Sequence, residues 1–365
     1  MIKLKKSDLK KSDILSENIK IIVNYLKIFR PISIILYGGY GRGEGSYFFN
    51  QKGQLKPYND YDILLITDNK IENHDLSLAK KNLEDKIDIR WIDLSQMTTK
   101  RLKVLEPKIF NYDLKYASKI IYGEKNILDL IPEMSSKDLG LKDADILFKT
   151  RMWTLLGSLN SDGFNKQLDA DEIRFFRNQM AKALLAVMDI LLLQKKAYHF
   201  SYTSRTKILK NLYSTKKEVL ELVSWAVNEK LHPKAPIMTP KDVKNLYNKV
   251  HIIFLSEMLE VLSKYYKISL NSVIKIKFVW KYHPFSLIRR IGYMILRKNL
   301  HYEKKIKLEI LQFLLILSYN KNNVDEKIFN TAIDFFISTY GSTSIDLSWD
   351  EMRVIIAEKR LNQDG

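Results

Sequence analysis

Two aspartates that follow a cluster of glycines are the residues of this chain best suited to chemistry. Asp60 and Asp62 flank a single tyrosine at the start of the apolar stretch YDILLIT (61–67). Alternate residues of a strand point to the same side, so the two carboxylates repel each other unless a cation neutralises them. Proteins commonly hold Mg²⁺ with one or two carboxylates together with substrate phosphates. The acid pair therefore predicts a divalent-cation site.

The glycine cluster GGYGRGEGS (38–46) ends the apolar run ISIILY (32–37) and holds five of the 13 glycines in the chain. Without a Cβ atom, a glycine backbone can approach a phosphate closely. The spacing of these glycines matches neither a dinucleotide-binding fingerprint nor a P-loop. A glycine turn for phosphates beside an acid pair for Mg²⁺ favours phosphoryl or nucleotidyl transfer.

The first ~125 residues alternate between strand and helix patterns, and these elements must position the acids and glycines. We predict strands at 32–38, 61–67, 87–93 and 119–123. A helix is expected after Ser16, which is a suitable N-cap, and a second amphipathic helix is opened by Asp75.

Helical periodicity dominates after about residue 138. We predict helices near 142–159, 170–195, 203–230, 240–267, 285–299, 302–320, 324–339 and 348–361. The segment 229–240 contains three prolines, which predicts a loop and a subdivision near 230–240. We therefore expect an α+β catalytic domain over 1–137 and a mostly α-helical substrate-binding domain over 138–365.

These residues resemble the signature of the DNA polymerase β-like nucleotidyltransferase superfamily. That signature is a hydrophobic strand, a glycine pair, a short helix, two acids separated by one residue on the next strand, and a third acid on a later strand. Gly38 and Gly39 match the glycine pair, while Asp60 and Asp62 match the acid pair. The stretch 46–59 makes the spacing longer than the family's usual one, so we interpret it as an insertion that lines an acceptor pocket.

The third acid of the signature is best matched by Asp88, which lies between isoleucines in KIDIRWI. Asp93, at the end of the same predicted strand, is the alternative.

The resemblance implies a nucleotidyltransferase-type small mixed sheet with flanking helices, followed by a helical domain as in the small-molecule, kanamycin-type members. The implied activity is Mg²⁺-dependent transfer of a nucleoside monophosphate from an NTP to an acceptor hydroxyl, amine or phosphate, with Mn²⁺ as a substitute metal. In a two-metal mechanism, Asp60, Asp62 and Asp88 would be catalytic and bind the metals.

The resemblance also implies nucleotide contacts around the glycine turn. The backbone at Gly38, Gly39 and Ser46 would hold the β- and γ-phosphates. Arg42 is a candidate phosphate contact, and its alternative is a salt bridge with Glu44.

A polar stripe marks the helix predicted at 170–195. Its members recur at helical spacing on an otherwise apolar helix: Arg174, Arg177, Asn178 and Lys182. By analogy with the helical domains of small-molecule nucleotidyltransferases, Arg177 and Lys182 are predicted nucleotide contacts, and Tyr202 and Arg205 could face the nucleotide or acceptor. The alternative is an ordinary amphipathic helix with a solvated basic face.

The formal net charge of +18 favours phosphate-bearing partners. The segment 264–307 carries 12 basic residues and one acid, and could bind RNA, lie on an anionic membrane surface or steer nucleotides. There is no cysteine, and no apolar run is long enough to cross a membrane, so we expect a cytoplasmic protein.

A small molecule is the favoured acceptor. RNA, tRNA or protein modification by a toxin-like enzyme is the alternative, and a catalytically inactive nucleotide- or RNA-binding protein is the alternative of another class. The oligomeric state stays open.

Overall fold

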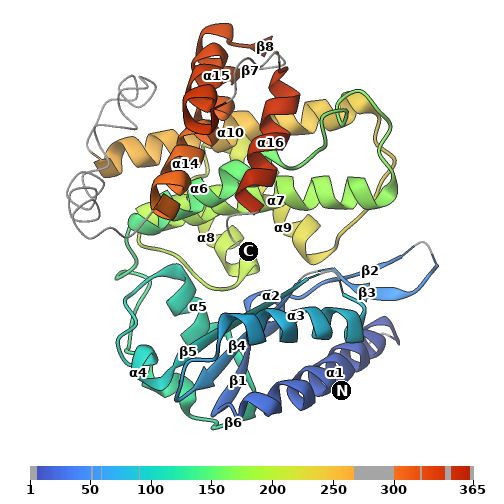
Figure 1. Cartoon of the computed structure of the whole chain (residues 1–365), viewed down its shortest axis with the longest axis vertical. Helices are drawn as coiled ribbons and strands as arrows, with labels where there is room; N and C mark the ends of the chain where they lie inside the picture. Colours follow the sequence, from blue (N-terminus) through green and yellow to red (C-terminus); the bar gives the residue numbers. More distant parts are fainter. Residues whose placement is uncertain are drawn as a thin grey trace. The chain divides into compact units, whose positions relative to one another are not determined.

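The computed structural model describes residues 6–50, 52–58, 60–89, 91–266, 300–320, 323–341 and 347–361. Over these residues the chain is α+β, with a small mixed sheet, flanking helices and a set of long helices (Figure 1). The chain divides into two compact units. The first comprises Met1–Gly140, Lys196–Ile208 and Asn228–Lys234; the second comprises Leu141–Lys195, Leu209–Val227 and Ala235–Gly365. Two segments of the helical half thus belong to the unit that contains the sheet.

The main sheet has four strands in the order β5-β4-β1-β6. Their bounds are β1 Ser33–Tyr37, β4 Tyr61–Thr67, β5 Ile92–Thr98 and β6 Lys119–Gly123. β4 runs antiparallel to β1 and parallel to β5, whereas β6 is antiparallel to β1. The predictions of strands at 32–38, 61–67 and 119–123 are confirmed. The stretch 46–59 contains a hairpin of β2 Tyr47–Phe49 and β3 Leu55–Pro57.

The helices of the first unit flank this sheet. They are α1 Lys6–Leu26, η1 Lys27–Phe29, α2 Gly38–Gly41, α3 Asn73–Ile87, α4 Thr99–Leu102, α5 Ile109–Ala117 and η2 Ile127–Leu130. The prediction of Ser16 as an N-cap is wrong, because α1 begins ten residues earlier. Leu15 and Ile19, four residues apart, both pack on the core, so the apolar stripe of α1 already spans this position. Asp75 lies in the first turn of α3, whose N-cap is Glu72.

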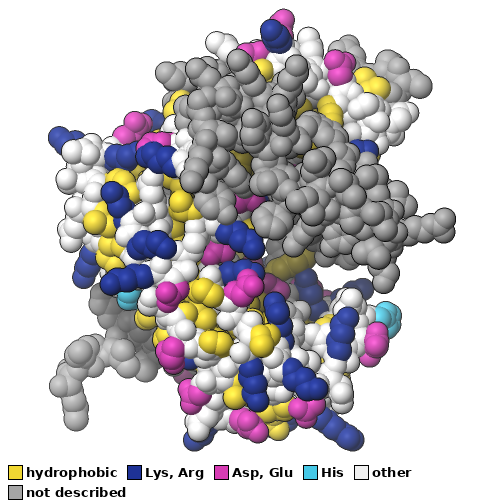
Figure 2. All heavy atoms as spheres, turned by 90° about the vertical axis from the view of Figure 1, so that its left-hand side faces the viewer, with side chains coloured by type: hydrophobic (Ala, Val, Ile, Leu, Met, Phe, Trp, Pro, Cys, Tyr) yellow, Lys and Arg dark blue, Asp and Glu magenta, His cyan; other side chains and the backbone are white. Residues whose placement is uncertain are grey.

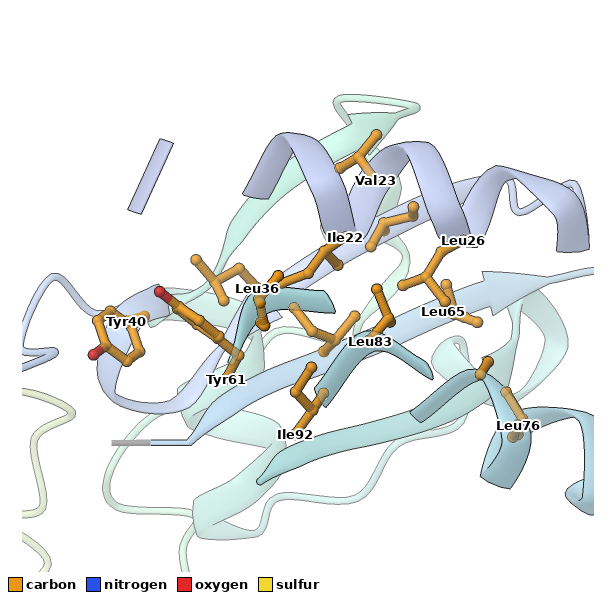
Figure 3. Close-up of a cluster of buried hydrophobic side chains, with 14 residues drawn as sticks. Ile22, Val23, Leu26, Leu36, Tyr40, Tyr61, Leu65, Leu76, Leu83 and Ile92 are labelled. Carbon is orange, nitrogen blue, oxygen red and sulfur yellow. The ribbon is translucent and has the colours of Figure 1, made fainter. Parts of the chain in front are cut away.

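Side chains from α1 and α3 cover one face of the sheet. Figure 3 shows Ile22, Val23 and Leu26 from α1 together with Leu76 and Leu83 from α3, packed on Leu36, Leu65 and Ile92. The opposite face carries Ile35, Leu64 and Ile66, which pack against Leu102 of α4, Leu114 of α5 and Ile127 of η2. β4 is therefore buried from both sides, which explains its continuous apolar sequence after Asp62.

The second unit is built mainly from long helices. They are α6 Lys142–Leu156, α7 Ala170–Gln194, α10 Pro240–Tyr266, α14 Leu300–Ser318, α15 Glu326–Tyr340 and α16 Trp349–Leu361, with a small pair of strands, β7 Tyr319–Asn320 and β8 Asn323–Val324. The helix predicted at 203–230 is instead two helices, α8 Tyr202–Leu212 and α9 Lys217–Leu231, because a turn closed by Lys216 N and Tyr213 O separates them. The helix predicted at 285–299 lies outside the described residues.

Candidate functional site

Asp62 lies near the start of β4, between two neighbouring strands. It pairs with Tyr37 of β1 on one side and with Asp93 of β5 on the other. Because directly paired residues of adjacent strands share a face of the sheet, these three side chains form a row across β1, β4 and β5. Asp60 precedes Asp62 by two residues, just before β4 begins. The fold thus gathers three carboxylates at one end of the sheet.

The protein environment disfavours a negative charge on Asp62. Burial, together with the negative charges of Asp60 and Asp93, raises the pKa of the Asp62 carboxyl to about 7. The positive charges of Lys230 and Arg42 act in the opposite direction. Since burial and like charges outweigh those cations, a further cation would stabilise the ionised acids. Lys230, in the segment Asn228–Lys234 of the first unit, had no signal in the sequence that related it to Asp62.

Asp88 does not lie on a strand, so the strand predicted at 87–93 is wrong. α3 runs to Ile87, and Asp88 forms its C-cap in the left-handed conformation, with φ 49° and ψ 53°. The Asp88 side chain is 83% exposed and forms an ion pair with Lys56, which lowers the pKa of Asp88. The physical reason is that Ile87 completes the buried stripe of α3, formed by Leu76, Ala79, Leu83 and Ile87.

Asp93, the alternative third acid, is the residue that pairs with Asp62 in the sheet. Burial raises the pKa of the Asp93 carboxyl and the charge of Asp60 raises it too, whereas a hydrogen bond from Tyr37 and the charge of Lys80 lower it. The Tyr37 hydroxyl also lies 3.5 Å from Ser95 Oγ. Tyr37 therefore links β1 to the acid on β5, and no sequence pattern predicted this role.

The glycine turn lies directly against Asp62. Gly38 has a φ of 61°, and a Cβ atom there would lie 1.9 Å from Asp62 Oδ2. A Cβ at Gly41 would lie 2.5 Å from the Leu36 carbonyl oxygen. Only glycine lets the backbone at Gly38 turn this tightly beside the carboxylate. The structure thus brings Gly38 of the predicted glycine pair against Asp62 of the predicted acid pair.

The end of the glycine segment packs over Tyr40. A Cβ atom at Gly45 would lie 2.1 Å from the Tyr40 ring, and the Tyr40 hydroxyl donates a 2.8 Å hydrogen bond to the Ser46 carbonyl oxygen. Ser46 is buried. The structure therefore places Ser46 within the packing beside the turn, and its contact with a phosphate stays a prediction.

Arg42 forms the ion pair with Glu44 that was its alternative role. Arg42 Nε lies 3.3 Å from Glu44 Oε2, and Arg42 Nη1 lies 3.2 Å from Asp113 Oδ2. The Arg42 side chain is only 10% exposed, so this is a partly buried network and not a surface salt bridge. Its guanidinium also lies 5.0 Å from the centroid of the Tyr202 ring. A phosphate contact by Arg42 stays a prediction.

The segment Lys196–Ile208 binds to this network. Ser201 Oγ and the Tyr202 backbone N donate hydrogen bonds of 2.9 and 2.8 Å to Glu44 Oε1. The Tyr198 hydroxyl is 3.1 Å from both carboxylate oxygens of Asp113. No local sequence pattern predicted this docking, because its partners lie about 85 to 158 residues apart.

Arg205 is buried and lies over aromatic rings of the same segment. Its guanidinium is 4.4 Å from the centroid of Tyr202 and 5.0 Å from that of Tyr198, and its Nη2 donates a 2.8 Å hydrogen bond to the Phe200 carbonyl. Tyr202 and Arg205 therefore belong to the packing around Arg42. Their predicted contact with a nucleotide or acceptor stays a prediction.

Arg177 and Lys182 belong to α7 of the second unit. Together with Asn178 they are only partly buried on a helix whose other residues are mostly buried, as the predicted stripe requires. The Arg177 guanidinium lies 5.2 Å from the centroid of the Trp225 ring. Their contact with a nucleotide stays a prediction.

The donor set at the acid row fits a hard divalent cation in its chemistry. Asp60, Asp62 and Asp93 offer only carboxylate oxygens, the ligand type that Mg²⁺ prefers, and burial and like charges disfavour the ionised form of Asp62 when no cation is bound. Within the described ranges, no group of three or more His, Cys, Asp or Glu side chains is already arranged to hold a metal ion. Cation binding would therefore require these side chains to adjust.

The structure bears only in part on two predictions about partners, which concern the basic segment 264–307 and membrane-spanning helices. Most of the basic segment 264–307 lies outside the described residues, which omit 267–299. Elsewhere, Figure 2 shows lysine and arginine side chains interspersed with acidic and apolar ones on the face it presents. No helix in the part of the chain that the structure describes is long and apolar enough to cross a membrane.

Comparisons of the chain with protein-family models, with curated proteins and with solved structures gave no match.

Proposed function

We propose that this chain is a Mg²⁺-dependent nucleotidyltransferase that moves a nucleoside monophosphate from an NTP to an acceptor hydroxyl, amine or phosphate. The observation that carries the proposal is the contact between Gly38 and Asp62, where a Cβ would come within 1.9 Å of the carboxylate. A backbone turn that can receive phosphates thus adjoins a carboxylate whose ionised form a cation would stabilise. The small mixed sheet with flanking helices supports a nucleotidyltransferase-type fold.

In this proposal Asp60, Asp62 and Asp93 hold Mg²⁺, or Mn²⁺ in its place. The metal would neutralise phosphate charge and orient the triphosphate. The backbone at Gly38 and Gly39 receives the β- and γ-phosphates. Asp93 takes the place of Asp88 as the third carboxylate, because it is the direct neighbour of Asp62 in the sheet.

The residues carry out an in-line substitution. Asp93 accepts the proton of the acceptor O–H or N–H group while the acceptor atom bonds to the α-phosphorus. The bond between the α-phosphorus and the bridging oxygen breaks, and pyrophosphate leaves. A catalytically inactive nucleotide-binding protein would have no need for three carboxylates in a site that raises the pKa of one of them.

The test is transfer of label from each α-³²P-labelled NTP in the presence of Mg²⁺. The purified protein is incubated separately with total RNA and with a small-metabolite extract, and the Asp60→Ala/Asp62→Ala variant is the control. Label that enters the metabolite pool, with pyrophosphate release and loss in the variant, would support a small-molecule acceptor. Label in RNA would favour the RNA-modifying alternative. An NTP that binds while no label moves would refute transfer and favour the binding-protein alternative.

A further inference from the structure

An exposed tryptophan and a lysine form a pair beside the edge strand of the sheet. The Trp91 side chain is 51% exposed, although the ammonium nitrogen of Lys80 lies only 3.2 Å from the centroid of its ring. Because Trp91 stays exposed beside that cation, it offers a flat apolar surface next to a positive charge.

α3 fixes this pair in place at the start of β5. Lys80 and Glu84 lie one turn apart on α3, and Glu84 Oε1 accepts a 2.9 Å hydrogen bond from the backbone N of Ile92. Lys80 Nζ and Glu84 Oε1 are 4.0 Å apart. Lys80 thus contacts Trp91 while Glu84 holds the adjacent Ile92, so the ring and the ammonium group are pre-organised.

The pair lies close to the acid row of the proposed transferase. Trp91 precedes Asp93 by two residues, and Asp93 pairs directly with Asp62. Lys80 lies on α3, which packs against β5. β5 is an edge strand of the sheet and Trp91 directly precedes it, so the pair lies at this edge, two residues from Asp93.

We propose that Trp91 and Lys80 form the acceptor subsite and that the acceptor is a nucleotide-like molecule, whose planar ring stacks on Trp91 and whose phosphate pairs with Lys80. The inference rests on the proposed function, in which Asp93 activates the acceptor. Indole rings stack on bases of any sequence, and a lysine ammonium group binds phosphate as a point charge. A polycationic acceptor of the aminoglycoside type is disfavoured here, because Lys80 would repel it.

The test uses 5′-AMP as the probe, with adenosine and inorganic phosphate beside it, in equilibrium dialysis against the full chain in EDTA without NTP. Trp91→Ala is expected to weaken AMP binding about tenfold, since it removes the stacking surface, whereas Trp91→Phe should retain most of it. Lys80→Met should weaken the binding of AMP and of phosphate but not that of adenosine. Lys86→Met is the matched control, because Lys86 lies on the same helix over the ring of Tyr25.

The proposal is overturned if wild-type protein does not bind AMP, or if Trp91→Ala and Lys80→Met bind it as well as Lys86→Met does. Thermal midpoints of all variants show that each one folds. Label transfer, measured on the same preparations, separates this inference from the proposed function. Binding that depends on Trp91 in a protein that moves no label would support the site and refute the transfer, whereas transfer that is unaffected by Trp91→Ala would overturn the subsite alone.

Discussion

Asp62 on β4 and Asp93 on β5 are direct partners in a parallel pair of strands, so the sheet presents their carboxylates side by side. Two like charges in a partly buried position are unfavourable unless a cation lies between or beside them. This relationship makes Asp93, and not Asp88, the third carboxylate of the proposed site.

Asp93→Asn is therefore expected to reduce label transfer at least 100-fold, because the acceptor loses its proton acceptor and the metal loses a ligand. Asp88→Asn should leave transfer within about twofold of wild type, since Asp88 is exposed and bonded to Lys56. The measurement is the initial rate of pyrophosphate release at saturating NTP. An inactive Asp88→Asn variant with an unchanged thermal midpoint would contradict this assignment.

The raised pKa of Asp62 predicts a pH-dependent stability. The folded chain keeps the proton of Asp62 up to a pH of about 7, whereas the unfolded chain releases it near its ordinary value of about 3.9. Between these values the folded state binds more protons than the unfolded state, so the free energy of unfolding falls as pH rises. The Asp62→Asn substitution removes this fall in the free energy of unfolding, because an amide does not ionise. We expect its thermal midpoint to exceed that of wild type by a few degrees at pH 8, and by little at pH 4.

Differential scanning fluorimetry in EDTA at several pH values measures this difference. Added Mg²⁺ at pH 8 should then raise the thermal midpoint of wild type and leave that of Asp62→Asn nearly unchanged, because a ligand stabilises only the state that binds it. A gap between the two proteins that stays constant from pH 4 to pH 8 would show that Asp62 is not destabilised in its ionised form.

Gly38 and Gly43 offer a matched pair of substitutions in the glycine turn. Both have positive φ values, 61° and 75°, but a Cβ atom at Gly38 would collide with Asp62 whereas one at Gly43 meets nothing within 4 Å. Gly43→Ala should therefore cost only about 1–2 kcal/mol for the left-handed conformation. Gly38→Ala should cost more and abolish transfer, because the turn or the carboxylate must move. Urea denaturation and label transfer on both variants check this, and equal behaviour would show that the turn is not built against Asp62.

The sequence predicted the local features of the site and missed those that depend on competition between elements. The proximity of Gly38 and Asp62 agrees with the expected glycine turn beside an acid pair, and the phosphate and metal roles of these residues stay predictions. Asp88 was wrongly predicted to lie on a strand, because the sequence around it fits both the two-residue period of a strand and the 3.6-residue period of a helix. As a strand it alternates with its isoleucines, but as a helix Ile87 completes the buried stripe, and the helix prevails.

The docking of Lys196–Ile208 could not have been predicted from local patterns. Glu44 and Asp113 bind this segment through Ser201 and Tyr198. A carboxylate close to an arginine in the sequence predicts a salt bridge. The sequence spacing does not show which distant hydroxyl group will donate a hydrogen bond to that carboxylate. Such contacts are set by tertiary packing, and the proposed partition at residue 137 did not include them.

Arg42 and Asp113 provide the last prediction, on how this network stabilises the first unit. Both side chains are mostly shielded from water, at 10% and 16% exposure, so each one that loses the other is a poorly solvated charge with fewer partners. Removing one partner by Arg42→Met or Asp113→Asn should cost about 3 kcal/mol. The double variant should cost less than the sum of the two single costs, with a coupling of about 0.5–3 kcal/mol.

Lys166→Met is the control. It breaks the exposed pair with Glu172 and should cost at most about 1 kcal/mol. The free energy of unfolding from urea denaturation measures all four variants. Strictly additive costs for Arg42 and Asp113 would mean that the two charges do not stabilise each other.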